Sequence, residues 1–173
     1  AAWLDAEVGF PGIPASPQGL GARADGAIEE ARRRLAAILG CAASDVIWTS
    51  GATEACNTVM QHVAAATATD STASVCVSAI EHPAVMESAR YFFPGRVDLM
   101  PVSREGVVEL GWLREQLQRK RPALVALMAA NNETGVLQPW REAQALCASA
   151  GVTFFCDATQ WCGRRAAGGL GPC

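Results

Sequence analysis

Four groups of polar residues directly follow apolar segments of the sequence, and their side chains could bind an anion, move a proton or pair with a cation. The groups are Ser50–Thr53, Glu81–His82, Asn131–Glu133 and Asp157–Gln160. Ligands of parallel α/β sheets bind beyond the carboxyl ends of the strands, so polar groups that follow several strands are expected to meet at one edge. This convergence is the main indication of function in the sequence.

The first group, Ser50-Gly51-Ala52-Thr53, combines small residues with the predicted start of a helix. Small residues let backbone N–H groups face a ligand, and a helix N-terminus carries partial positive charge, so the segment could hold a phosphate. The alternative is an ordinary turn in which Ser or Thr caps the helix. The segment is not a P-loop, because the Gly-Lys-Ser/Thr ending is missing.

The other three groups each have a catalytic or binding interpretation and a structural one. Asp157 follows an apolar Val-Phe-Phe-Cys run. A carboxylate there needs a partner, and a cationic ring nitrogen would serve; the alternative is a cap on the next turn. His82 could be an acid/base group or a structural residue before Pro83. Asn131 and Asn132 could donate hydrogen bonds to a ligand or form a turn.

The elements that must position these residues alternate along the chain. Apolar runs predict strands, and residues of helical period bounded by Pro or Gly predict helices. This alternation predicts an α/β fold, a three-layer α/β/α arrangement with a mostly parallel sheet. Residues 1–21 are expected to form a loop leading into one domain over residues 22–173. The predicted strands are 46–49, 74–78, 97–102, 123–128 and 152–156, and the predicted helices are 22–39, 53–66, 83–91, 110–119 and 139–150.

Composition excludes several classes of protein. Of 173 residues, 50% are hydrophobic and 18% charged, and the net charge is −3, which argues against disorder and against nucleic-acid binding by a broad basic face. No apolar run reaches the roughly 20 residues of a membrane span. The seven cysteines form no Cys-x-x-Cys pair, so no metal site is expected. They favour thiols in a reducing compartment, the cytoplasm or an organellar matrix.

The four polar groups also resemble, in order and spacing, motifs of the cysteine desulfurases, which are class V, fold-type I enzymes that use pyridoxal 5′-phosphate (PLP). Residues 49–57 resemble the family's TSGATEANN segment, and residues 81–85 resemble EHPAV. Residues 131–135 resemble NNETG, and residues 157–160 resemble DATQ. The resemblance runs from about Gly12 to about Gly163. It implies a partial PLP-binding large domain, without the C-terminal part of that domain and without the small domain.

The resemblance implies a role for each matching residue. The backbone of Ala52 and the side chain of Thr53 would hold the PLP phosphate, and Asp157 would pair with the pyridinium nitrogen. His82 would stack on the ring and act as the catalytic acid/base group. The implied reaction takes sulfur from L-cysteine, leaving L-alanine and an enzyme-bound persulfide. Asn132 and Gln160 would lie near the phenolic oxygen of the cofactor.

The chain lacks two catalytic parts of the family. The lysine that holds the cofactor lies in a Ser-x-His-Lys segment absent here, and the single lysine, Lys120, is expected to be solvated. No cysteine matches the sulfur acceptor of the family. The expectation is therefore an inactive fragment of a cysteine desulfurase, homodimeric when complete, that serves a protein sulfur acceptor such as an iron–sulfur cluster assembly partner. The alternatives are a selenocysteine lyase fragment and a non-catalytic remnant that acts as a binding module.

Overall fold

The computed structural model describes residues 9, 12–16 and 18–165, so parts of the predicted N-terminal loop and the last residues, including Cys173, lie outside the described residues. Among the described residues the chain forms two compact units, the first ending at Trp48 and the second beginning at Thr49. Within the described part, none of the helices combines the length and the apolarity that a membrane crossing requires.

The first unit is built on helix α2 (Gly19–Leu39), followed by the short helix η1 (Ala43–Asp45). The helix starts three residues earlier than its apolar period predicts. Gly21 is buried where a side chain would collide with the carbonyl oxygen of Ser16, so only glycine fits there. The helix ends as predicted at Gly40, whose left-handed backbone lets its N–H donate to Ala36 O at 2.8 Å.

The prediction of a strand over residues 46–49 is wrong. These residues are not assigned to any strand, and Ile47 is 79% exposed. The carbonyl oxygen of Val46 accepts a hydrogen bond from Arg32 Nη1, and the Arg32 guanidinium lies 5.6 Å from the centre of the Trp48 ring. An apolar run indicates burial, but a strand forms only where a neighbouring strand completes its hydrogen bonds.

The second unit is a parallel four-stranded sheet in the order β2-β1-β3-β4. The strands are β1 (Val75–Ser78), β2 (Val97–Met100), β3 (Leu124–Ala126) and β4 (Thr153–Phe155). The chain moves outward from β1 to β2 and then returns to the other side of β1 for β3 and β4. This reversal creates a switch point between β1 and β3, and such points are where α/β sheets bind ligands.

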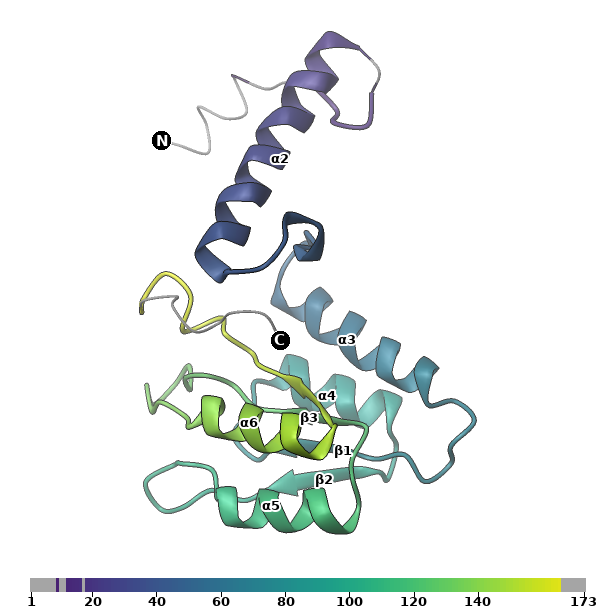
Figure 1. The fold of residues 1–173 in the computed structure, drawn as a ribbon, viewed down its shortest axis with the longest axis vertical. Helices are drawn as coiled ribbons and strands as arrows, with labels where there is room; N and C mark the ends of the chain where they lie inside the picture. Colours follow the sequence, from purple (N-terminus) through teal and green to yellow (C-terminus); the bar gives the residue numbers. More distant parts are fainter. Residues whose placement is uncertain (1–8, 10–11, 17, 166–173) are drawn as a thin grey trace. The chain divides into compact units, whose positions relative to one another are not determined.

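Four helices cover the two faces of the sheet (Figure 1). On one face lie α3 (Ala52–Ala66) and α4 (Pro83–Phe92), and on the other lie α5 (Leu110–Arg119) and α6 (Trp140–Ala150). The predicted α/β fold with a mostly parallel sheet is therefore confirmed, and the four helices lie within one residue of their predicted bounds.

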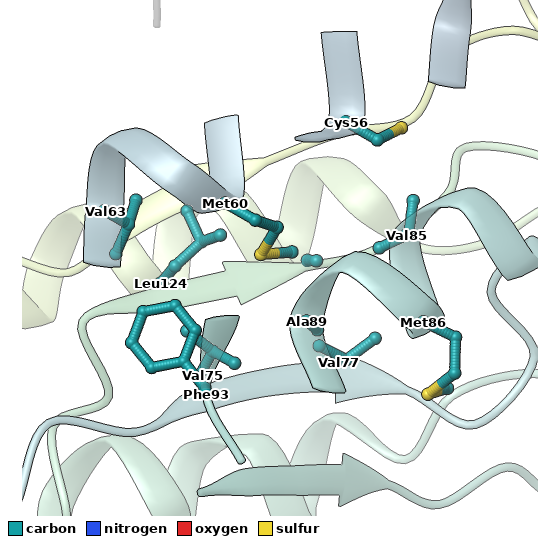
Figure 2. Close-up of a cluster of buried hydrophobic side chains, with 11 residues drawn as sticks. Cys56, Met60, Val63, Val75, Val77, Val85, Met86, Ala89, Phe93 and Leu124 are labelled. Carbon is teal, nitrogen blue, oxygen red and sulfur yellow. The ribbon is translucent and has the colours of Figure 1, made fainter. Parts of the chain in front are cut away.

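A cluster of buried hydrophobic side chains lies between β1, β3, α3 and α4 (Figure 2). Val75 and Val77 point to this face because side chains alternate along a strand, while Cys76 between them belongs to the opposite face. Met60 and Val63 reach the cluster from α3, and Phe93 closes it from the end of α4. This core anchors the first turns of α3 and α4, which both begin at the carboxyl edge of the sheet.

The backbone of Gly151 determines how α6 ends. Its φ of 65° is left-handed, and alanine there is expected to lower the free energy of unfolding by roughly 1–2 kcal/mol. Gly111 is the matched control: it lies inside α5, and a methyl group added to it would meet nothing within 4 Å, so Gly111→Ala is expected to stabilise by about 0.5–1 kcal/mol. Urea unfolding of both variants measures the two changes in unfolding free energy. A change in the same direction for both variants would contradict this account.

Candidate functional site

A pocket of about 140 Å³ lies beyond the carboxyl ends of β1, β3 and β4, beside the first turn of α3. All six residues proposed from the sequence as cofactor-binding line this one pocket, although they come from four separate segments. Three further residues, Met128, Ala130 and Thr159, complete the lining. The six proposed residues are Ala52, Thr53, His82, Asn132, Asp157 and Gln160.

The start of α3 presents backbone N–H groups without a side-chain cap. Gly51 is the N-cap residue and makes no side-chain hydrogen bond. Ser50 does not cap the helix: its N–H and hydroxyl donate to Glu54 Oε2 at 2.7 and 2.5 Å, and these bonds lower the pKa of Glu54. The first amides of a helix have no partner within the helix, so those of Ala52 and Thr53 suit a bound anion.

After β4, Asp157 both caps a turn and lines the pocket. Its Oδ1 accepts hydrogen bonds from the N–H of Thr159 at 2.9 Å and from the Thr159 hydroxyl at 2.6 Å, so it caps the following turn. The same residue lines the pocket and is half-buried. A carboxylate has about four acceptor positions, so the cap leaves capacity for a cationic partner.

His82 lies at the start of α4, where it is both a helix cap and part of the pocket wall. Its Nδ1 accepts a hydrogen bond from Ala84 N at 3.1 Å, and Pro83 occupies the first helical position as predicted. In a neutral imidazole an accepting Nδ1 leaves the proton on Nε2. The ring is exposed and lines the pocket, so its structural and ligand-facing roles do not exclude each other.

The two asparagines after β3 divide the roles that the sequence left open. Asn131 forms the turn: its Oδ1 accepts from Glu133 N, Thr134 N and the Thr134 hydroxyl within 3.0 Å. Asn132 is exposed and lines the pocket. Gln160, which is half-buried, reaches the same pocket from the loop after β4.

The sequence analysis assigned no individual role to four residues of this region. Met128 and Ala130 line the pocket but belong to an apolar run that suggests only a strand. Thr159 lies within the Asp157–Gln160 group, and its hydroxyl donates a hydrogen bond to Asp157 Oδ1. Glu81 stands beside His82, and its carboxyl is buried under the loops, 9% exposed. The signal for Glu81 was its position directly after an apolar strand, where a charged residue is seldom buried without a purpose.

The burial of Glu81 makes the stability of the fold depend on pH. Burial, assisted by the charge of Asp157, raises the pKa of Glu81 from 4.5 to about 7, against the lowering effect of hydrogen bonds from Ser78 and Met128. The folded protein therefore holds this proton more tightly than the unfolded chain. The resulting stabilisation is fully present below pH 4.5 and is lost as the pH rises through about 7.

We expect the difference in unfolding free energy between wild type and Glu81→Gln to change over this window, because glutamine does not titrate. Urea unfolding of both proteins from about pH 5 to pH 8 measures it. The wild type should lose stability relative to the variant as the pH rises. A constant difference between the two proteins would show that Glu81 does not titrate with a raised pKa.

Lys120 lies apart from this chemistry, and the buried cysteines hold their protons tightly. Lys120 is 52% exposed on its side chain and pairs with Asp98 Oδ1 at 2.6 Å. It lines a hollow with residues that begin β1 and β2, at the amino edge of the sheet, so it does not face the pocket. Burial raises the pKa of the Cys56 and Cys147 thiols to about 11 and that of Cys76 to about 12.

Comparison with known proteins gives consistent results. The family model for aminotransferase class V matches residues 15–167. The chain is 34% identical over 154 residues to "Cysteine desulfurase IscS" of Dictyoglomus turgidum, covering 88% of this chain and 39% of that protein. It is 31% identical over 147 residues to the mitosomal cysteine desulfurase of Encephalitozoon cuniculi, covering 83% of this chain and 34% of that one.

The fold agrees as well. The crystal structure of DndA from Streptomyces lividans matches with a TM-score of 0.84 and 32% identity, covering 98% of this chain and 46% of that chain. The chain spans between about a third and two fifths of the length of these curated relatives. The relatives are named as enzymes, and their family depends on PLP. Because the family model covers most of the sequence, the chain belongs to the aminotransferase class-V family, and it is similar to cysteine desulfurases.

Proposed function

We propose that this chain supplies the cofactor pocket of a PLP-dependent cysteine desulfurase. In this proposal the complete enzyme takes sulfur from L-cysteine and leaves L-alanine and a persulfide on an enzyme cysteine. The observation that carries the proposal is the single pocket in which the uncapped first turn of α3 and the carboxylate of Asp157 occur together. Such a pocket suits a planar ligand with an anionic group and a cationic ring nitrogen.

The residues present fit this cofactor. The N–H group of Ala52 and the side chain of Thr53 would hold its phosphate, together with the Thr53 N–H, because the first amides of α3 have no partner in the helix. Asp157, already oriented by Thr159, would pair with the ring nitrogen. When bound, the cofactor supplies an electron sink for the substrate carbon. His82 would contact the ring and move a proton, with its Nδ1 held by the Ala84 amide.

Asn132 and Gln160 line the pocket and carry amide groups, so they would donate hydrogen bonds to an oxygen of the ligand. Met128 and Ala130 are apolar parts of the same wall and would exclude water from one side of it. We assign binding and proton transfer to these residues. The lysine that anchors the cofactor and the cysteine that accepts sulfur are assigned outside this chain, since Lys120 lies at the other edge of the sheet.

The proposal extends to the partners of the complete enzyme. We propose a homodimer that receives L-cysteine and passes sulfur to an acceptor protein, in the cytoplasm or an organellar matrix. The named relatives include bacterial, mitochondrial and mitosomal proteins. Light scattering of the complete protein tests the dimer.

Binding of PLP to this protein tests the assignment of the pocket. Titration with PLP, followed by tryptophan fluorescence and by cofactor absorbance, is expected to show saturable binding. Pyridoxal is the matched control ligand: it lacks the phosphate and should bind more weakly, because the first turn of α3 then has no anion to hold. Equal affinity for both ligands, or no saturable binding of either, would contradict the proposal.

Activity of the complete protein separates the desulfurase from its alternatives. Alanine formation from L-cysteine supports the desulfurase, and preferential turnover of selenocysteine supports the lyase. Binding of PLP with no alanine formed from either substrate supports a non-catalytic remnant.

A further inference from the structure

The loops after β1 and β3 are tied together by one buried carboxyl group. Glu81 Oε1 accepts a hydrogen bond from the hydroxyl of Ser78 at 2.5 Å and from the backbone N–H of Met128 at 2.7 Å. Ser78 is the last residue of β1, and Met128 follows β3. The strands stop pairing at this point, so the carboxylate takes the place that a strand carbonyl would fill.

A second bond joins the same two loops. The side-chain Nδ2 of Asn131 donates to the carbonyl oxygen of Ile80 at 3.2 Å. The two bonds connect the residues just before His82 with the residues just before Asn132. Both His82 and Asn132 line the pocket, whereas Glu81 does not.

The second oxygen of the Glu81 carboxyl has no hydrogen-bond partner among the described residues, although it is buried. A buried polar atom without a partner costs stability, so its retention calls for a compensating role. The hydrogen bond from the Met128 N–H provides this compensation. If Glu81 were replaced by an apolar residue, that N–H would lose its partner.

We propose that Glu81 is a positioning residue of the pocket, which holds the loop carrying His82 against the loop carrying Ala130 and Asn132. The inference rests on the proposed function in so far as the pocket is taken to bind PLP. Glu81 acts through these two loops and makes no contact with the pocket itself.

The titratable groups around Glu81 affect how it positions the loops. Asp157 approaches from the end of β4 and Cys56 from α3, while His82 is its neighbour in the chain. The raised pKa of Glu81 keeps its carboxyl largely protonated below neutral pH, so a second negative charge beside Asp157 is avoided there. Above neutral pH the Glu81 carboxyl ionises, and the arrangement of the loops becomes sensitive to its repulsion with Asp157.

The test compares Glu81→Gln with Glu81→Ala, with Glu87→Gln as the matched control. Glutamine keeps the oxygen that accepts from Ser78 and Met128 but cannot titrate, and alanine removes the acceptor. Glu87 lies on α4, where it is exposed and pairs with Arg90. Three measurements are made on each protein: the amide signal of Met128 by NMR, the imidazole signals of His82 and His62, and the affinity for PLP. His62 is exposed on α3 and serves as an internal reference.

In the wild type, the Met128 amide signal should shift with a midpoint near pH 7, and in Glu81→Gln it should not shift. In Glu81→Ala, exchange of the Met128 amide should be roughly 10- to 100-fold faster, as expected on losing a hydrogen bond to a charged group. In Glu81→Ala, the imidazole signals of His82 should shift, while those of His62 should keep their wild-type positions. Affinity for PLP should fall about tenfold in Glu81→Ala and be restored to within about threefold by glutamine.

The outcomes separate the two proposals. Met128 and His82 signals in Glu81→Ala that match those of the wild type would overturn the positioning role, whatever the wild type binds. If Glu81→Ala does not fold, a wild-type Met128 amide that is insensitive to pH would overturn it equally. Signals that change as expected in a wild type that binds no PLP would support the positioning role and contradict the proposed function.

Discussion

Replacement of Asp157 by alanine is expected to weaken binding of PLP by roughly 10- to 100-fold. The carboxylate is the acidic group that lines the pocket among its described residues, and a hydrogen bond to a charged group contributes about 1.5–3 kcal/mol. Fluorescence titration of the variant with PLP measures the loss. Binding as tight as that of the wild type would show that the ring nitrogen does not meet Asp157.

Two controls separate the charge of Asp157 from its turn. Asp157→Asn keeps an oxygen for the Thr159 bonds but removes the charge, and it should bind PLP nearly as weakly as the alanine variant. Asp70 makes the same turn elsewhere, because its Oδ1 accepts from Thr72 N at 2.8 Å and from the Thr72 hydroxyl at 2.6 Å. Asp70→Ala should therefore leave the affinity unchanged. A loss of affinity in Asp70→Ala would indicate a general effect on the fold.

Replacement of Phe93 by alanine is expected to lower the free energy of unfolding by about 3–5 kcal/mol. Phe93 is fully buried where α4 meets the sheet, beside Val75 and Leu124 (Figure 2). Truncating a buried Phe removes its transfer free energy and leaves a cavity. Because domains are stable by only about 5–15 kcal/mol, this change would remove a large part of the total. Urea unfolding at equilibrium provides the measurement.

Tyr91 is the matched control for Phe93. It lies on α4, two residues before Phe93, and is 78% exposed. Its ring packs edge-on against that of Phe92, with the ring centres 5.0 Å apart. Tyr91→Ala is expected to change the unfolding free energy by less than about 1 kcal/mol. A similar loss in both variants would mean that the core does not lie between α4 and the sheet.

The element types could be predicted because their signals are local. Helix α5 has the bounds that its period of apolar residues predicts, and α4 begins at Pro83 because proline suits the first helical position. Residues 46–49 show where this reasoning fails. Their apolar character is a local property, but a strand requires a partner whose position depends on the rest of the chain.

The polar groups that line the pocket were also visible in the sequence, at the ends of predicted strands. The sequence did not show which residue of each group forms a turn and which lines the pocket. Asn131 and Asn132 are adjacent and chemically identical, yet one closes a turn and the other lines the pocket. Asp157 caps a turn and lines the pocket as well. Such assignments depend on the direction of each side chain, which neighbouring elements determine.

The sequence alone thus determined the α-helices and four of the strands, because periodicity, Pro and Gly act over a few residues. Only the tertiary structure decided the strand order β2-β1-β3-β4. That order makes β1 and β3 neighbours and allows Glu81 to hold Met128, 47 positions away. Contacts over such separations depend on how the apolar faces of the elements pack together, and no local pattern of residues specifies that arrangement.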